Sequence, residues 1–237
     1  MLVVIETVIV LFFAFLIASV AGFAGVAIAV PLCSAIMGLT NAKVVVNIIS
    51  IAFNSAIVFQ HRKQLKIKEL IPVLLLVMAG MVAGVFINKL VAAEEVLIKL
   101  LGVTILVISL IKLFYNKEIE LGKIGGAVVL VLSGVISYLF LCGGIVMVLY
   151  MSTRYKEKDL FRAGNSFLFL VQSLYMTFIL YEQSVYTTDN VMIGLIGVVP
   201  VIIATIIGKH ILNVISQEKF EKVTCILLII MAVMLMI

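Results

Sequence analysis

The residues best suited to hold a ligand form two short polar stripes in an otherwise apolar chain. Asn47, Ser50 and Asn54 are spaced by three and four residues, so they share one face of a helix. Asn165 and Gln172 are seven residues apart and share a face in the same way. Their amides can donate hydrogen bonds to an oxyanion without adding charge. The stripes indicate a binding site for a small anion; the competing interpretation is that the amides only join helices to one another.

Two glycine-rich sequences provide a second kind of anion-binding group. Residues 22–25 read Gly-Phe-Ala-Gly, and residues 142–144 read Cys-Gly-Gly. A helix that begins at such a break exposes backbone N–H groups with partial positive charge, and glycine lets a ligand approach them closely. We expect these residues to complete the site. The full candidate set is Gly22, Ala24, Gly25, Asn47, Ser50, Asn54, Ser55, Cys142, Gly143, Gly144, Asn165, Gln172 and Ser173.

Sequence motifs for catalysis or metal binding are absent. The chain contains no HExxH, no GxSxG, no P-loop and no pair of intramembrane aspartates. Cys33, Cys142 and Cys225 lie in apolar segments without the spacing of metal ligands. No Asp or Glu lies in the middle of an apolar segment, so a proton relay or cation site is not evident. We therefore expect no enzyme, metal or cofactor; a membrane enzyme that uses Cys142 is the alternative.

The elements that position these residues are expected to lie in a membrane. Of 237 residues, 65% are hydrophobic and 12% are charged, whereas soluble domains average about 45–50% and about 25%. Apolar runs of about 20 residues recur, each long enough to cross a hydrocarbon core. The net charge of +5 is spread over loops, which fits a lipid bilayer and argues against a nucleic-acid partner. The sequence predicts an all-α, multi-pass protein of the cell membrane, by expectation a prokaryotic plasma membrane.

Polar breaks divide the chain into eight apolar segments. The first would make a helix of about 54 Å, which is too long for one crossing. It lacks a basic n-region, so we expect no cleaved signal peptide. We interpret the first and fifth segments as broken helix pairs that return to their side of entry; the alternative is a tilted helix with a glycine packing face. The segments cover residues 2–37, 44–60, 70–91, 96–115, 124–151, 160–181, 191–212 and 220–237.

The two halves of the chain look like copies of each other. Three sets of residues align at offsets of 118 to 123 positions. We expect two repeats, residues 1–115 and 124–237, joined by a cytoplasmic linker over 116–123, each with one broken hairpin and three spanning helices. The aligned pairs are Ala24 with Gly143, Gly25 with Gly144, Asn47 with Asn165, Asn54 with Gln172, Ser55 with Ser173, Glu95 with Glu218, and Lys99 with Lys222.

Loop charge predicts that the two copies are inverted. The loop over residues 62–68 is basic, whereas its counterpart over 182–189 is acidic, so the two should face opposite sides of the membrane. With returning hairpins, fourteen of the 17 basic residues face the cytoplasm and both termini lie outside. Arg162 belongs to this cytoplasmic set, and the predicted binding region contains no full charge. Inverted repeats with broken helices are a transporter architecture with a site near the bilayer midplane.

The breaks at Gly22-Phe23-Ala24-Gly25, with Pro31 after them, and at Cys142-Gly143-Gly144 resemble the sulfite exporter TauE/SafE family. Its members have about this length, two related halves and a glycine-rich stretch early in each half. The resemblance covers essentially the whole chain. It implies movement of sulfite, sulfonates and related small sulfur-containing anions. We therefore expect a transporter of a small anion; the alternative is an inverted-repeat carrier of another metabolite, such as the drug/metabolite type.

Overall fold

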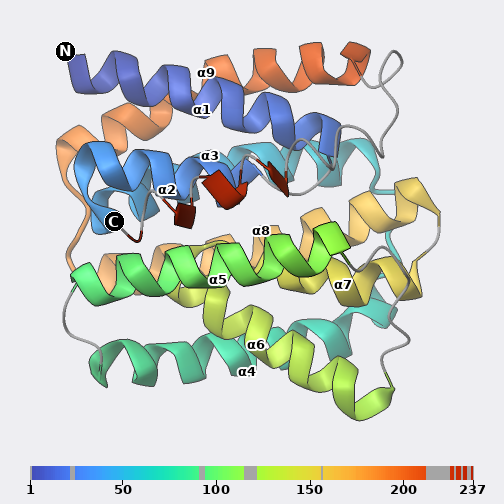
Figure 1. The fold of residues 1–237 in the computed structure, drawn as a ribbon. Coiled ribbons are helices and arrows are strands. Elements are labelled where there is room, and N and C mark those ends of the chain that lie inside the picture. Colours follow the sequence, from blue (N-terminus) through green and yellow to red (C-terminus); the bar gives the residue numbers. More distant parts are fainter. Residues whose placement is uncertain are drawn as a thin grey trace.

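The computed structural model describes residues 2–21, 25–90, 94–114, 122–155 and 157–211, with a few positions after residue 224. Every regular element in these ranges is an α-helix, which confirms the predicted all-α class (Figure 1). Five of these helices are long and apolar enough to cross a membrane, so the chain is a multi-pass membrane protein. The five spans are Leu39–Gln60, Ile67–Leu90, Lys123–Phe140, Leu160–Glu182 and Thr188–Gly208.

The first half begins with two helices where the sequence predicts a broken segment. They pack against each other, and residues 22–24 between them lie outside the described part of the chain. Pro31 lies inside the second helix, where the Ser34 hydroxyl donates a hydrogen bond of 2.7 Å to its carbonyl oxygen. Three longer helices follow. The elements of this half are α1 (Leu2–Ala21), α2 (Gly25–Met37), α3 (Leu39–Gln60), α4 (Ile67–Leu90) and α5 (Glu94–Phe114).

The second half repeats this order of long, short, long and long helices in its described residues. Its break begins at Leu141, whose φ of 59° is left-handed and whose N–H donates to the Ser137 carbonyl over 2.9 Å. That conformation ends one helix, and the next begins after Gly143. The predicted segment over 220–237 lies largely outside the described residues. The elements are α6 (Lys123–Phe140), α7 (Gly144–Arg154), α8 (Lys158–Glu182) and α9 (Thr188–Ile211).

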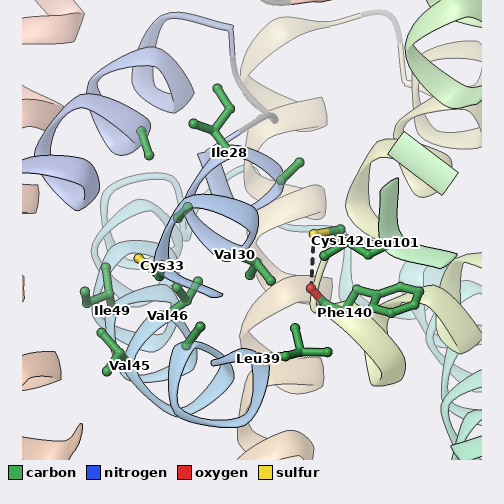
Figure 2. Close-up of a cluster of buried hydrophobic side chains, with 14 of the residues drawn as sticks. Ile28, Val30, Cys33, Leu39, Val45, Val46, Ile49, Leu101, Phe140 and Cys142 are labelled. Carbon is green, nitrogen blue, oxygen red and sulfur yellow. Dashed lines mark hydrogen bonds between the residues drawn. The ribbon is translucent and has the colours of Figure 1, made fainter. Parts of the chain in front are cut away.

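The two short helices do not span the bilayer. At 1.5 Å per residue, the 13 residues of α2 and the 11 residues of α7 give about 20 Å and about 16 Å, short of the roughly 30 Å of hydrocarbon. Most residues of α2 are buried, and Figure 2 shows side chains of α2, α3 and the second break packed into one apolar cluster. Both short helices are therefore too short to cross a bilayer, and α2 lies within the protein.

Contacts between the halves follow one pattern. α1 packs against α9, α4 packs against α6, and α3 packs against α8. In the internal repeat, α1 corresponds to α6 and α4 corresponds to α9. The contact between α1 and α9 is therefore equivalent to the contact between α6 and α4. α4 and α6 approach closely because a Cβ on Gly80 or Gly134 would collide with the backbone of the opposite helix. α3 of the first half and α8 of the second half also pack against each other, so these two helices border the space between the halves.

The equivalent central helices run in opposite directions. In Figure 1, the connection from α3 to α4 lies at one end of the bundle, and the connection from α8 to α9 lies at the other end. The first connection is the predicted basic loop, and the second is the predicted acidic one. The placement of these ends relative to a membrane, and the limits of the two repeats, stay predictions.

Candidate functional site

A cavity of about 310 Å³ lies between the two halves of the chain. Residues from both helix breaks and from both polar stripes line it, as the sequence predicts for a shared site. Its apolar wall includes three aromatic rings: Phe15 of α1, Phe53 of α3 and Phe169 of α8. The predicted residues that the cavity brings together are Gly25, Ser50, Asn54, Cys142, Gly144, Asn165, Gln172 and Ser173.

Five predicted residues do not line the cavity or cannot be placed. Gly22 and Ala24 lie outside the described residues, and Ser55 and Gly143 lie away from the lining. Asn47 is fully buried, and its amide joins α3 to α8. The Asn47 Nδ2 donates to the Thr177 Oγ1 over 2.8 Å and to the Ser173 carbonyl oxygen over 3.2 Å. Asn47 therefore makes the helix contact that was the competing interpretation of the stripes.

Gln172 and Asn54 present amides that the protein itself orients. The Ser137 hydroxyl donates to the Gln172 Oε1 over 2.6 Å, and the Gln172 Nε2 donates to the Leu168 carbonyl over 3.1 Å. The Asn54 Nδ2 donates to the Ser50 carbonyl over 2.8 Å. An amide nitrogen carries two donors. The bond to Ser50 uses one donor of Asn54, which retains the other for a ligand in the cavity. The second donor of Gln172 contacts the Met147 Sδ over 3.8 Å, a weak acceptor that an anion would replace.

Two further polar groups of the cavity have no partner within the described protein. Asn165 is 3% exposed and Ser50 is 5% exposed, yet the Asn165 Oδ1 and the Ser50 Oγ make no hydrogen bond in the described residues. An unsatisfied buried polar group costs about 1–3 kcal/mol. A hydroxyl rotates to donate or accept, and an amide can exchange its oxygen and nitrogen by a flip. One such group comes from each half, so a ligand between the halves would satisfy both.

Arg162 is a charged residue of the cavity that the sequence interpretation did not place there. It lies near the start of α8, lines the cavity and is half-buried. Its Nη2 donates to the Ser19 carbonyl oxygen of α1 over 3.3 Å. The expectation of a binding region without a full charge is therefore wrong. The signal was available, because Arg162 precedes Asn165 by three residues and so extends the same helix face by one turn.

The cavity reaches the end of the bundle that carries the basic loop. Gln60 and His61, at the end of α3, line it together with Arg162. Gln60 is exposed and His61 is partly exposed, so the cavity meets the protein surface there. Gln60 and His61 therefore form the mouth of the cavity.

The glycines of the breaks serve close packing as well as the cavity. A Cβ on Gly144 would collide with the Phe169 ring, and one on Gly25 would collide with the Ala18 methyl group. A Cβ on Gly143 would collide with the Ser133 carbonyl and so could not be accommodated. The glycine packing face, which was the alternative interpretation, is therefore present. Gly25 and Gly144 border the cavity in addition.

Cys142 joins the two breaks at the centre of the molecule. Its thiol lies 3.0 Å from the Phe140 carbonyl oxygen, the contact drawn in Figure 2, and 3.8 Å from the Val26 carbonyl oxygen. Cys142 is 3% exposed. In the described residues, no cluster of three or more His, Cys, Asp or Glu could hold a metal ion. The arrangement can therefore bind a small anion through Arg162, the amides and the hydroxyls.

Comparison with models of protein families gives a match over most of the chain. The family model described as sulfite exporter TauE/SafE matches residues 7–235, which is nearly the whole chain. No curated protein and no solved structure matches.

Proposed function

The chain belongs to the sulfite exporter TauE/SafE family, a family of membrane transporters, and we propose that it moves a small anion through the cavity between its halves. The proposed cargo is sulfite, a sulfonate or a related sulfur-containing anion, and the proposed direction is export. The alternative cargo is another small metabolite, carried by the same cavity.

Arg162 beside unpartnered polar groups is the observation that carries this proposal. A guanidinium presents N–H groups in a planar fork that matches two oxygens of an oxyanion. The Ser50 hydroxyl and the Asn165 amide can reach other oxygens of the same ligand from α3 and α8. One full positive charge with neutral donors favours a monovalent anion and disfavours cations.

The aromatic wall supports the same cargo. Phe15 and Phe53 pack edge to face with ring centroids 5.2 Å apart, and Phe169 lies against Gly144. Apolar walls keep the effective dielectric constant low, which strengthens the attraction between Arg162 and an anion. They also offer contact to the carbon chain of a sulfonate. The wall thus accommodates sulfite and a short organic sulfonate alike.

Alternating access between inverted repeats is the proposed mechanism. The opposite directions of α3 and α8, and the placement of their loops at opposite ends, support the inversion (Figure 1). By loop charge, the basic-loop end is the cytoplasmic one. The cavity at that end would receive an anion from the cytoplasm. Movement of one half against the other would then release it on the other side.

The membrane potential provides a driving force for export. Arg162 is attached to α8, so the anion leaves that positive charge behind when it crosses. One elementary charge across 100 mV corresponds to about 2.3 kcal/mol, which drives a monovalent anion out of an inside-negative cell. Facilitated diffusion is therefore sufficient for export, and no coupling ion is required.

Flux in proteoliposomes tests the proposal. Purified protein would be assayed with sulfite, sulfoacetate, sulfate and a neutral metabolite. We expect saturable flux of sulfite or sulfoacetate that the neutral metabolite does not inhibit. Flux of the neutral metabolite alone would favour the alternative cargo and contradict the anion assignment.

A further inference from the structure

Each half of the chain carries a cation one turn before its polar stripe. Lys43 precedes Asn47 by four residues in α3, and Arg162 precedes Asn165 by three residues in α8. The offset between the two cations is 119 positions, the same offset that relates Gly25 to Gly144. The offset of the breaks thus pairs Lys43 with Arg162, whereas the offset of 118 between the stripes would pair it with Phe161. The contacts of the two cations favour the first pairing. The sequence interpretation had left Lys43 in a loop, but the structure places it in the second turn of α3.

The contacts of the two cations are also equivalent. Arg162 contacts Ser19 of α1, and the Lys43 Nζ lies 5.3 Å from the centroid of the Tyr138 ring of α6. Ser19 and Tyr138 are again 119 positions apart. In both cases, a cation of one half touches the first helix of the other half.

Glycine packing supports the equivalence of these two partners. A Cβ on Gly208 of α9 would collide with the Ser19 side chain, and one on Gly84 of α4 would collide with the Tyr138 ring. α9 and α4 are repeat-related helices. The two cations thus occupy equivalent positions in the two halves, although the groups that they contact differ.

We propose that Lys43 is a second anion-binding residue, which holds the transported anion when the opposite end of the bundle opens. This inference rests on the proposed transport of an anion. Because α3 and α8 run in opposite directions, their first turns lie at opposite ends of the bundle (Figure 1). Arg162 borders the cavity in this structure, whereas Lys43 does not.

The Lys43 end of the protein is closed by hydrogen bonds between the halves. The Gln183 Nε2 donates to the Tyr138 hydroxyl over 3.1 Å, and the Asn190 Nδ2 donates to the Asn41 Oδ1 over 3.2 Å. The Asn47 amide donates to Thr177 below them. The Asn190–Asn41 and Asn47–Thr177 pairs join different halves, whereas Gln183 and Tyr138 both belong to the second half. Movement of one half against the other would break the Asn190–Asn41 and Asn47–Thr177 bonds together, open the Lys43 end and close the Arg162 end.

The contact between Lys43 and the Tyr138 ring suits such an exchange. A cation over an aromatic ring is held by the ring quadrupole, a weaker attraction than that of a full negative charge. An anion that arrives in the opened site can therefore draw the Lys43 ammonium away from the Tyr138 ring. Arg162 would at the same time return to contacts within the protein. The anion would pass from a guanidinium on one side to an ammonium on the other.

Sided kinetics in oriented proteoliposomes test this pairing. The half-saturating sulfoacetate concentration would be measured separately from each face for Lys43→Met and Arg162→Met. We expect Lys43→Met to raise the value about tenfold or more from the face opposite the basic loop, and to change the value from the basic-loop face much less. Arg162→Met should show the reverse, and Lys43→Arg should restore most of the affinity.

Lys89 provides the matched control for Lys43. It is exposed in the last turn of α4, and its Nζ lies 6.0 Å from the Phe86 ring centroid, so Lys89→Met removes a similar contact outside the proposed site. We expect wild-type kinetics for it. Lys43→Gln replaces Lys43→Met if the latter does not fold. Suppose that the wild-type protein transports anions, but Lys43→Met changes the half-saturating concentration equally from both faces or not at all. The pairing of Lys43 with Arg162 would then be wrong, and the proposed function would stand. A wild-type protein without anion transport would overturn the proposed function with it.

Discussion

Replacement of Arg162 by glutamine removes the one cation that lines the described cavity while retaining much of the side-chain length. The variant loses a charge-assisted hydrogen bond to the anion, which is worth about 1.5–3 kcal/mol. The expected loss of affinity is therefore roughly tenfold to somewhat more than a hundredfold. The contact with the Ser19 carbonyl accounts for little of this, because its 3.3 Å length marks a weak bond.

Arg162→Lys separates charge from geometry in the same assay. Lysine keeps the positive charge but lacks the planar fork, so an intermediate affinity is expected. Arg154→Gln is the matched control, because Arg154 is an exposed arginine in the last turn of α7 and does not line the cavity. Sulfoacetate uptake into proteoliposomes measures all three variants. Equal half-saturating concentrations for Arg162→Gln, Arg154→Gln and wild type would refute the assignment of Arg162.

Three further outcomes follow from the site and its packing. Gln172→Leu should raise the half-saturating concentration about tenfold or more in the same assay, since it loses a donor to the anion and leaves the Ser137 hydroxyl without its acceptor; wild-type flux would reduce Gln172 to a helix contact. Gly144→Ala should destabilise the protein by about 1–3 kcal/mol, because the added Cβ overlaps the Phe169 ring, and Phe169→Leu in the same chain should recover part of the loss in a thermal unfolding measurement. Anion efflux from proteoliposomes clamped with potassium and valinomycin should follow the imposed voltage; efflux that follows only a proton gradient would indicate electroneutral proton coupling instead.

Residue spacing along the chain predicted which side chains share a helix face. Asn54 and Gln172 were placed in one site because each lies seven residues after an amide, and both line the cavity. Spacing does not show which residues of a neighbouring helix pack against a given helix face. Asn47 has the same spacing, yet it faces Ser173 and Thr177 of α8 and joins the helices instead.

The limits of the predicted segments explain one of the two missed cations. Lys43 lay outside the predicted segment over 44–60, whereas Arg162 lay inside the segment over 160–181 but was counted only among the cytoplasmic charges. α3 begins earlier, at Leu39, because Gly38 adopts a positive φ of 78° that separates it from α2. Lys43 thereby enters the helix. The equivalent contacts with Ser19 and Tyr138 depend on packing between halves, which a single sequence does not display.

Protection of a cysteine inside the cavity tests the central claim most directly. Ile57 lines the cavity between Asn54 and its mouth, and the three native cysteines are buried. Ile57→Cys would be labelled with a neutral maleimide added to either face, with and without sulfoacetate. We predict labelling from the basic-loop face that sulfoacetate slows and a neutral analogue does not, with Arg162→Gln abolishing the protection. Labelling that sulfoacetate leaves unchanged, or that proceeds only from the opposite face, would contradict an anion site in this cavity.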